Sequence, residues 1–482
     1  MRHTAPRRRT RAVPLLAGAG ALALGAGLLA PDAGPRQATA AADTAAPVAR
    51  VWVTTPDRSS TLEQREDVAF TPDPQGTRLA VDPGWRGQEF VGAGASVTEA
   101  SAHLISGLPA GQREELLRDL FSPEDGIGLN YLRQPLGSTD FNSGGFYTYE
   151  DTPGEFSIDR DREQIIPVVR RALDHNPDIR FMGSPWSAPA WMKDNGSLNG
   201  GSLRAENHGD YADYLVRAVQ EYAGEGIVLS ELTVQNEPLF ETIYPSMYMS
   251  AADQAAFLRE LDGALGAAGL DTGLYTYDHN WDRPDYPLEV LAATADLDRV
   301  RGAAFHCYGG RPEAQQQVAD TGAHVFFTEC SGTDSDTPEA TFRDTLRWQA
   351  ENLVVRNLRS GGETVILWNL ALDAGGGPHQ GNCQDRCNGV VEIDGGRVAY
   401  NAEYYLLGHL TGFVDAGARR IGSEVADGVQ NVVFDNPDGT RTAYVVNTAD
   451  SQRTFSLGDG GAYLPYTLPA GAVATFVWTP QG

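Results

Sequence analysis

The feature that most constrains the fold is an alternation of short apolar runs with amphipathic helical segments, which begins at residue 87. Near-continuous apolar runs are typical of strands buried on both faces of a parallel sheet that helices cover. Eight runs follow one another, which favours an α/β fold with a closed (β/α)8 barrel, the TIM barrel. The runs lie at 89–94, 128–134, 179–184, 232–236, 273–277, 302–308, 324–329 and 363–369.

Helices are expected between the runs, and Ser250 has the position and the hydroxyl of an N-cap for one of them. The alternative architecture is an open doubly wound sheet, whose ligand site lies at one switch point. Polar residues follow most of the runs rather than one, which favours the barrel. The clearest predicted helices span 111–121, 160–175, 210–222, 251–268, 338–358 and 401–410.

After residue 411 the pattern changes to short β segments, which favour a β-sandwich. Between two of these segments, residues 435–439 have the Asn, Pro, Asp and Gly composition of a hairpin turn. The β segments are 431–434, 442–447 and 474–478.

A further strand is predicted before the barrel, at 50–55. Val51 and Val53 fall on one face of this strand and Thr54 falls on the other, as in a half-buried strand. This strand comes too early in the chain for the barrel, so we expect it to join the sandwich. The predicted domains are 43–86 for N-terminal sandwich strands, 87–411 for the catalytic barrel and 412–482 for the C-terminal sandwich.

The first 42 residues have the composition of an export signal followed by a linker. Residues 7–11 are basic, residues 13–30 are apolar, and residues 38–40 offer small side chains for cleavage. A membrane anchor is the alternative, but the apolar stretch is short, rich in glycine and bracketed by prolines. We therefore expect a secreted protein with no stable membrane anchor after signal removal.

The formal net charge of −27 limits the partners that this chain can bind. Repulsion disfavours nucleic acids, anionic membranes and acidic polysaccharides. A neutral glycan fits this charge. The simpler alternative is that the acidic surface serves only solubility in an extracellular setting. A monomer is expected.

Four cysteines occur in the chain. Cys383 and Cys387 have the spacing of a disulfide that closes a small local loop. Cys307 and Cys330 each lie at or just after a predicted strand end, and they are either free and buried or paired with each other. His379 lies near Cys383 and Cys387 without a clear zinc spacing, so neither a metal nor a cofactor is predicted.

Two glutamates stand at the ends of predicted strands. Glu237 follows Asn236 directly after the fourth run, and Glu329 ends the seventh. The carboxyl ends of the strands form the active-site face of a TIM barrel. Two carboxylates there predict glycoside hydrolysis, with one acid/base and one nucleophile. For Glu237 the structural alternative is the start of a helix, because Pro238 follows it.

Other strand ends carry the groups of a sugar-binding site, since indoles stack on sugar rings while amides and carboxylates bind hydroxyls. Structural alternatives are a cap for Asp140, rim packing for the two tryptophans and a core position for His306. The candidates are Arg133, Asp140, Trp186, Asn236, His306, Tyr308, Trp368 and Asn369.

Three of these candidates have a more specific expected role. Asn236 would bind the 2-hydroxyl of the sugar, a contact that strengthens in the transition state. Tyr308 would donate to Glu329 and keep it ionised. Arg133 would place positive charge below the same carboxylate.

Five segments together resemble glycoside hydrolase family 30, and the closest likeness is to its glucosylceramidase and β-glucosidase members. The resemblance runs from about residue 85 to the C-terminus and implies a (β/α)8 barrel, a β-sandwich made from both chain ends, and retention of anomeric configuration. The segments are VGAGASVTEA at 91–100, SPWSAPAWMK at 184–193, TVQNEP at 233–238, FTEC at 327–330 and LWNLAL at 367–372.

By motif position, the resemblance implies that Glu237 is the acid/base and Glu329 the nucleophile. Tyr244 and Tyr308 resemble neighbours of these glutamates. Cys307 stands where glucosylceramidases often carry Trp, and the loop 375–383 also departs from their pattern. Residues that resemble those holding the glucosyl unit are Asp140, Trp186, Asn236 and Trp368.

The implied function is a secreted retaining β-glycosidase that acts on neutral β-glucosides, including glycolipids of sphingolipid metabolism. Both departures from the family pattern flank the side of the leaving group, so its identity stays open. One alternative is an endo-β-1,6-glucanase of the same family. A transglycosylase would use the same residues. A different class is a non-catalytic glycan-binding protein, which the presence of both glutamates disfavours.

Overall fold

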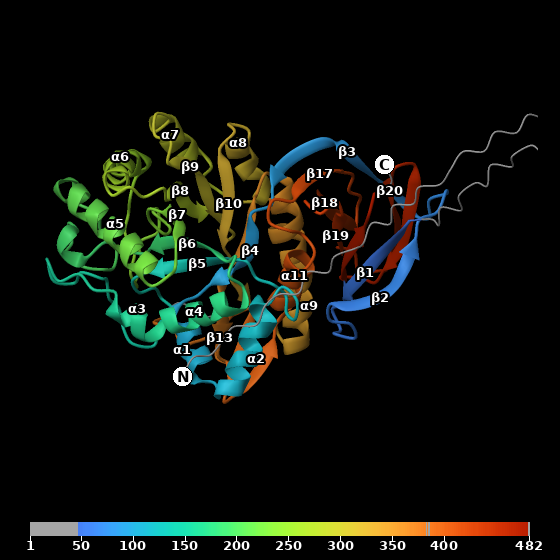
Figure 1. Cartoon of the computed structure of the whole chain (residues 1–482), viewed down its shortest axis with the longest axis horizontal. Coiled ribbons are helices and arrows are strands. Elements are labelled where there is room, and N and C mark those ends of the chain that lie inside the picture. The colour runs from blue at the N-terminus through green and yellow to red at the C-terminus, as the bar shows by residue number, and fades with distance from the viewer. Residues whose placement is uncertain (1–46, 382, 384–385, 481–482) are drawn as a thin grey trace, which may run out of the picture. The chain divides into compact units, whose positions relative to one another are not determined.

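The structure is a computed structural model that describes residues 47–381, 383 and 386–480 (Figure 1). The predicted export segment at 1–42 lies outside these residues. Within the described ranges, no helix combines the length and the apolar character needed to cross a membrane.

Eight parallel strands form the barrel in the order β10-β9-β8-β7-β6-β5-β4-β12. The two outer strands of that order are also joined, because Glu363 donates its amide to Val325 at 2.8 Å and Trp368 to Cys330 at 3.0 Å. The sheet is closed, and the (β/α)8 prediction is confirmed. The strands are β4 (Gly92–Ser96), β5 (Tyr131–Leu136), β6 (Arg180–Pro185), β7 (Leu229–Thr233), β8 (Gly273–Asn280), β9 (Val300–His306), β10 (His324–Glu329) and β12 (Thr364–Asn369).

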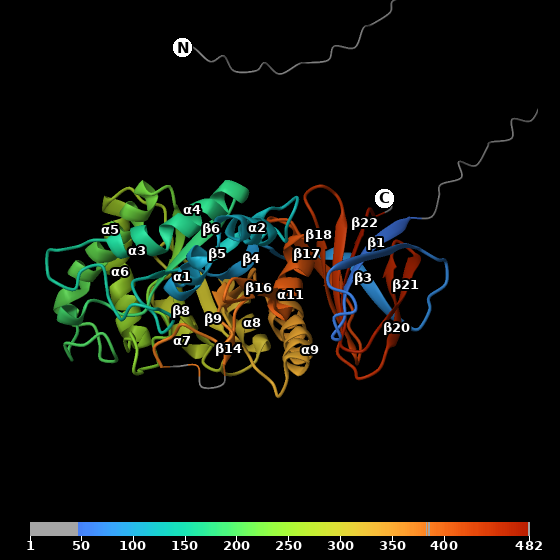
Figure 2. The same cartoon turned by 90° about the horizontal axis from the view of Figure 1, so that it is seen from below.

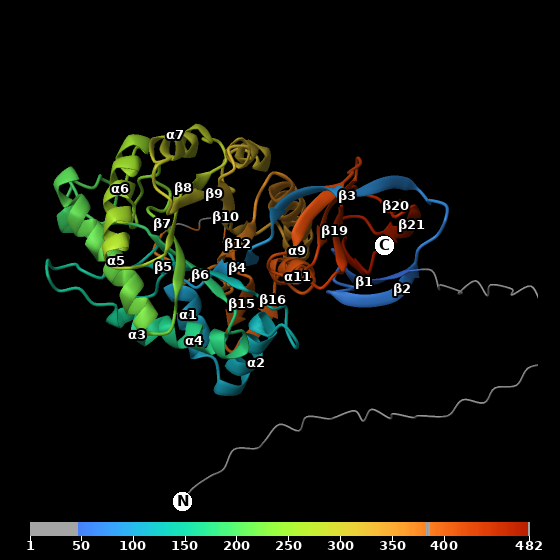
Figure 3. The same ribbon diagram turned by 45° about the horizontal axis from the view of Figure 1, so that its top comes forward.

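Helices cover the outside of these strands, as α5, α6 and α7 do in Figure 3. The predicted helix 160–175 is two helices, because Pro167 at the start of α4 cannot donate the hydrogen bond that would continue α3. The helices are α1 (Glu99–Gly107), α2 (Ala110–Phe121), α3 (Asp159–Gln164), α4 (Ile166–His175), α5 (His208–Gly224), α6 (Ala251–Ala267), α7 (Asp285–Ala293), α8 (Gln316–Ala319), α9 (Pro338–Gln349), α10 (Asn357–Arg359) and α11 (Ala402–Thr411).

Two expectations about individual helices have different outcomes. Ser250 caps α6, and its hydroxyl accepts a hydrogen bond from the amide of Asp253. The predicted helix 338–358 is not one regular helix, since a π-helical segment, Ala350–Arg356, separates α9 from α10.

Short strands pair segments that lie beyond the barrel strands. They bring the segment after β10 beside the segment after β12. One pair is β11 (Gly332–Thr333) with β14 (Cys387–Asn388), and a second sheet contains β13 (Ala371–Leu372), β15 (Val391–Asp394) and β16 (Arg397–Tyr400).

Strands from both chain ends form the sandwich, in the order β2-β1-β22-β19-β18-β17-β3-β20-β21 (Figure 2). The long β3 pairs with β20 through its first residues and with β17 through its later ones. The strands are β1 (Val48–Thr54), β2 (Glu63–Ala69), β3 (Thr77–Glu89), β17 (Arg419–Ser423), β18 (Val429–Asp435), β19 (Arg441–Asn447), β20 (Arg453–Asp459), β21 (Ala462–Leu468) and β22 (Val473–Trp478).

The first strand of the sandwich is buried more completely than a half-buried pattern implies. Val51 and Val53 lie in the sandwich core, but Thr54 on the other face is also buried. Its hydroxyl lies 2.9 Å from Nε2 of His409 on α11, and the hydroxyl of Thr475 lies 3.0 Å from Nδ1. This face of β1 therefore packs on the last barrel helix.

Candidate active site

The site follows from the alternation of side chains along the barrel strands. Tyr131, Met182, Tyr275, Ala304, Phe326 and Ile366 form an apolar cluster, one residue from each of six strands. Successive side chains of a strand point to opposite faces, so the next residue on the same face is two positions further along. On five of the six strands this step leads to Arg133, Ser184, His306, Thr328 and Trp368.

Asp278 replaces the expected residue on the sixth strand, and it was not predicted. The regular step along β8 leads to Tyr277. However, Tyr277 and Asp278 both have positive φ, 76° and 58°, and the register between β8 and β9 shifts at this point. This bulge turns Asp278 toward the other site residues. The predicted run ended at Tyr277, so Asp278 lay just outside it. An acidic residue directly after an apolar run is the sequence signal that could have identified Asp278.

Asp278 is fully buried and charged. Burial by itself raises the pKa of Asp278, but Arg133 and His306 outweigh burial and hold the pKa well below its usual range. Five groups surround its carboxylate: Arg133, Ser184 and Thr233 donate to Oδ2 at 2.7 Å, Thr328 donates to Oδ1 at 2.7 Å, and His306 Nε2 lies 3.0 Å from Oδ1.

Glu237 and Glu329 meet above this network. One carboxylate oxygen of Glu237 lies within 4.8 Å of one of Glu329. Retaining glycosidases have carboxyl groups about 5–5.5 Å apart, and inverting ones about 6.5–9.5 Å. The bound on this oxygen–oxygen distance favours the shorter of the two separations.

Glu237 has the environment of a proton donor. It is 9% exposed, and burial chiefly raises its pKa, with Glu329 adding to the effect and a hydrogen bond from His306 opposing it. Its backbone has a positive φ of 44°, held by an amide hydrogen bond to the carbonyl of Asp278 at 3.0 Å. No helix begins at Glu237 or Pro238, so the structural alternative for this residue is wrong.

Glu329 has the environment of an anion. Its Oε2 accepts a hydrogen bond from Arg133 Nη1 at 2.5 Å, and its Oε1 accepts one from the hydroxyl of Tyr308 at 3.0 Å. Burial and the charge of Glu329 raise the pKa of Tyr308, so the phenol remains a donor. The two glutamates thus differ in their partners although they share one cavity.

Arg133 also orients Asn236. The second guanidinium nitrogen of Arg133 donates to Asn236 Oδ1 at 2.8 Å. Because that oxygen is engaged, the amide group of Asn236 is left to donate to a hydroxyl in the cavity.

His306 is a buried cation between two carboxylates. Its Nδ1 lies 3.1 Å from Glu237 Oε1 and its Nε2 faces Asp278. Burial lowers the pKa of His306, but the charges of Glu329 and Asp278 outweigh burial and raise it to about 9. Both ring nitrogens therefore carry protons at neutral pH.

Glu237, His306 and Glu329 are the one group among the described residues whose potential ligand atoms lie close enough to hold a metal ion. A metal needs a free lone pair on the imidazole. Because His306 is protonated on both nitrogens and holds two carboxylates, this group suits a proton network rather than a metal.

A cavity of about 240 Å³ opens over the two glutamates. Trp186 and Trp368 stack on each other in its wall, with ring centroids 4.9 Å apart, and the Arg133 guanidinium lies 4.7 Å and 5.6 Å from these rings. The cavity is lined by Asp140, Phe141, Trp186, Asn236, Glu237, Phe240, Tyr244, His279, Asn280, Tyr308, Glu329, Trp368 and Cys387.

Several residues that were expected to contact the sugar do line this cavity, whereas His306 and Asn369 do not; those in the lining are Asp140, Trp186, Asn236, Tyr244, Tyr308 and Trp368. His306 lies behind Glu237 and is fully buried. Asn369 is also buried, and its Oδ1 accepts a hydrogen bond from Thr98 at 2.9 Å. It follows Trp368 on β12, so the alternation of the strand directs these two side chains to opposite faces. Their expected direct contact with substrate is therefore corrected.

Two disulfides border the cavity. Cys307 and Cys330 are paired, which connects the segments that follow β9 and β10 next to Tyr308 and Glu329. Cys383 and Cys387 form the local loop, and Cys387 lines the cavity.

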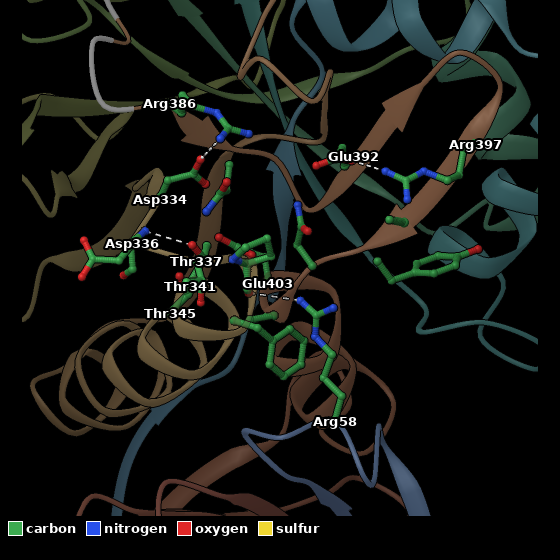
Figure 4. Close-up of a pocket in the computed structure, with 18 residues that line it drawn as sticks. Arg58, Asp334, Asp336, Thr337, Thr341, Thr345, Arg386, Glu392, Arg397 and Glu403 are labelled. Carbon is green, nitrogen blue, oxygen red and sulfur yellow. Dashed lines mark hydrogen bonds and ion pairs between the residues drawn. The ribbon is translucent and has the colours of Figure 1, made fainter.

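A second cavity, of about 300 Å³, lies beside α9 and α11 and is shown in Figure 4. Its lining contains ion pairs, Asp334 with Arg386 at 2.9 Å and Glu392 with Arg397 at 3.1 Å. Burial raises the pKa of its Glu403 to about 8. This charged cavity shares no lining residue with the cavity over the glutamates.

Comparisons with known proteins agree with this geometry. Residues 90–414 match the glycosyl hydrolase family 30 TIM-barrel domain, and residues 417–476 match the family 30 β-sandwich domain. An endo-1,6-β-D-glucanase of Trichoderma harzianum is 31% identical over 440 residues, which cover 84% of this chain and 88% of that protein.

Two further relatives bear on specificity. The lysosomal acid glucosylceramidase of Mus musculus is 28% identical over 441 residues, covering 84% of each chain. A solved endo-β1,6-glucanase structure is 28% identical, with a TM-score of 0.83 over 90% of this chain and 100% of that one. The expected closest likeness to glucosylceramidases is thus not supported, since the Trichoderma endo-1,6-β-glucanase is the more similar relative. On the match to both of its domains, the chain belongs to glycoside hydrolase family 30.

Proposed function

We propose that this glycoside hydrolase is an endo-β-1,6-glucanase that retains anomeric configuration. The observation that carries the proposal is the close pair of Glu237 and Glu329, one with a raised pKa and the other held by Arg133 and Tyr308. The similarity to endo-1,6-β-glucanases supports the choice of substrate.

In the first step Glu329 attacks the anomeric carbon while Glu237 gives its proton to the glycosidic oxygen, which leaves with the bond electrons. A covalent glycosyl–Glu329 ester forms. In the second step Glu237, now ionised, takes a proton from water, whose oxygen displaces Glu329. Two inversions at the anomeric carbon give net retention.

The surrounding residues have separate roles in this proposal. The Asn236 amide binds the 2-hydroxyl of the sugar in the cavity. Asp140 accepts hydrogen bonds from hydroxyl groups of the same sugar. Trp186, Trp368 and Tyr244 form its apolar walls. Arg133 donates a hydrogen bond to Glu329 and fixes its position, and His306 orients Glu237 without touching substrate.

A second candidate activity is hydrolysis of glucosylceramide or of small β-glucosides. It is favoured by the 28% identity to the mouse glucosylceramidase across most of both chains. The two activities share the glucosyl position and differ in what lies beyond it. Only substrates with different leaving groups therefore separate them.

The test is a panel of β-1,6-glucan, an aryl β-glucoside and glucosylceramide in detergent, with products followed by proton NMR in the first minutes. We expect oligosaccharides from β-1,6-glucan, with the β-anomer appearing first. Activity confined to glucosylceramide would replace the proposed substrate, and early α-anomer would exclude retention.

Variants test the two carboxylate roles. Glu329→Ala should abolish turnover, and azide should restore part of it while giving an inverted glycosyl azide. Glu237→Ala should impair poor leaving groups far more than activated aryl ones. In the wild type, kcat/KM should fall as pH rises through the raised pKa of Glu237. Equal losses in both variants on all substrates would reject this assignment.

Secretion is part of the proposal and rests on the composition of residues 1–42. Expression of the full chain in an exporting bacterial host should place protein lacking this segment in the medium. An intact N-terminus on cell-retained protein would argue against it.

A further inference from the structure

We infer that the groove beyond Tyr308 binds further sugar residues of a neutral β-glucan chain, with Trp348 as its stacking platform. This inference rests on the proposed function. The groove has a volume of about 410 Å³, larger than the cavity over the glutamates. Tyr308 lines both, so the two hollows share one wall.

Position is the first argument for this occupant. The cavity over the glutamates is small, and an endo-acting enzyme must hold sugars on more than one side of the cleaved bond. Tyr308 reaches Glu329 with its hydroxyl, yet 49% of its surface is exposed. A glucan chain that leaves the cavity over the exposed side of Tyr308 enters the groove directly.

Trp348 is the second argument. It lies on α9 and lines the groove, and 46% of this large indole is exposed. Leaving so much apolar surface in water is unfavourable, whereas covering it with the C–H face of a pyranose removes that cost. An indole beside polar groups is the usual composition of a sugar subsite.

The polar lining of the groove is suited to a neutral ligand. Ser331, Thr333 and Ser335 offer hydroxyl groups, and none of the described residues that line the groove is cationic. Its carboxylate, Asp344, is already paired with Arg343 at 2.9 Å. The neighbouring cavity of Figure 4 is lined instead by ion pairs, so we limit the subsite to the groove.

The groove wall is also held in place before any ligand binds. The disulfide between Cys307 and Cys330 joins the two segments that carry it. The Tyr308 hydroxyl accepts a hydrogen bond from the amide of Ser331 at 3.2 Å, and its own amide donates to Asn280 at 3.0 Å. A fixed wall loses little conformational freedom on binding, which favours affinity for a flexible 1,6-linked chain.

The experiment compares Trp348→Ala with the wild type on β-1,6-linked gluco-oligosaccharides of two to six residues and on an aryl β-glucoside. We expect kcat/KM on the longest oligosaccharide to fall about tenfold, the effect of losing one aromatic contact. The aryl glucoside, which does not reach the groove, should be hydrolysed at the wild-type rate. Trp348→Phe should recover part of the loss.

Trp85→Ala is the matched control. Trp85 is also 46% exposed, but it lies on β3 of the sandwich under Arg420 and does not line the groove. The Trp85→Ala variant should show the same dependence of kcat/KM on oligosaccharide length as the wild type. The inference is overturned if Trp348→Ala lowers kcat/KM equally on short and long substrates, or if it changes kcat/KM on neither. It is also overturned if Trp348→Ala and Trp85→Ala have the same effect.

Failure of the proposed function is a separate result. It would appear in the wild type, as no cleavage of β-1,6-linked substrates at all. The same comparison made on the β-glucan that the wild type does cleave would then decide whether Trp348 serves the longer chain.

Discussion

Among the residues that the structure describes, Asp278 and Asp161 are both fully buried, but their environments have opposite effects on their pKa values. Asp278 at the end of β8 is surrounded by Arg133, His306 and three hydroxyl groups, and its pKa lies well below the usual range. Asp161 on α3 accepts hydrogen bonds of 2.5 Å from the hydroxyls of Tyr147, Tyr149 and Tyr222. Burial outweighs these three bonds and raises the pKa of Asp161.

The difference shows what a buried carboxylate needs in order to remain charged. Hydrogen bonds from neutral donors satisfy the carboxylate oxygens but do not offset the free energy lost when the carboxylate leaves water. Nearby cations offset more of that loss. The Asp161 cluster therefore acts as a structural tie between residues 147–149, α3 and α5. The Asp278 network instead stores fixed charge beneath Glu237 and Glu329, where the reaction would develop charge.

The largest expected effect comes from Asp278→Asn. This change keeps the shape of the side chain but leaves Arg133 and His306 with less compensating charge. We expect stability to fall by about 3–5 kcal/mol and turnover to fall at least about 100-fold because both glutamates shift. Urea unfolding and the rate on the best substrate would measure the two effects. An activity loss no greater than that of Asp161→Asn would break the comparison.

The second prediction concerns pH. His306 has a folded pKa of about 9, above the unfolded value of about 6.5. Its stabilisation is therefore complete below pH 6.5 and is lost as pH rises through 9, by up to about 3 kcal/mol. Unfolding by urea between pH 6 and 9.5 should show this loss. His306→Gln should have a smaller slope over the same range, and an unchanged slope would contradict the prediction.

Asp161→Asn should have a smaller and purely structural effect. Because the pKa of Asp161 is raised, its contribution to stability is greatest below its ordinary pKa and decreases as pH rises. We expect a loss of about 1–3 kcal/mol, from imperfectly satisfied phenol groups, and turnover within about twofold of the wild type. The cost should be smaller at pH 7 than at pH 4, the reverse of Asp278→Asn, whose depressed pKa makes its contribution greater at pH 7.

The smallest effect is expected for Tyr222→Phe, which removes one of the three phenols around Asp161. Stability should fall by about 1 kcal/mol, with unchanged kcat. The remaining two hydrogen bonds favour the ionised form less, so the pKa of Asp161 should rise further. Thermal unfolding and carboxyl NMR titration would check these points, and a lower pKa would count against the cluster as described.

The sequence predicted the barrel well because the eight apolar runs and their separation reflect a property of each segment alone. All eight runs overlap observed strands, and no end differs from the observed end by more than three residues; the first, second, fourth and sixth runs are displaced as a whole by two or three residues. The sequence did contain a signal for the break before Pro167, since proline has no backbone N–H to donate within a helix. The π-helical segment after α9 has no comparable local signal.

The site was only partly predictable. Glu237, Glu329, Trp186 and Trp368 were found because they stand at strand ends. Asp278 was missed because a bulge breaks the two-residue period on which the expectation depended. The pairing of Cys307 with Cys330 was left open, since the sequence does not show how far apart two cysteines that follow different strands lie in space.

By itself, the sequence determined the order of strands and helices, the class of fold and the two carboxylates, because periodicity and residue type act locally along the chain. Only the tertiary structure decided how those carboxylates differ. The raised pKa of Glu237, the protonation of His306 and the charge of Asp278 depend on burial and on partners within hydrogen-bond distance. Electrostatic free energies follow distances in space, and residues far apart in the chain set them here.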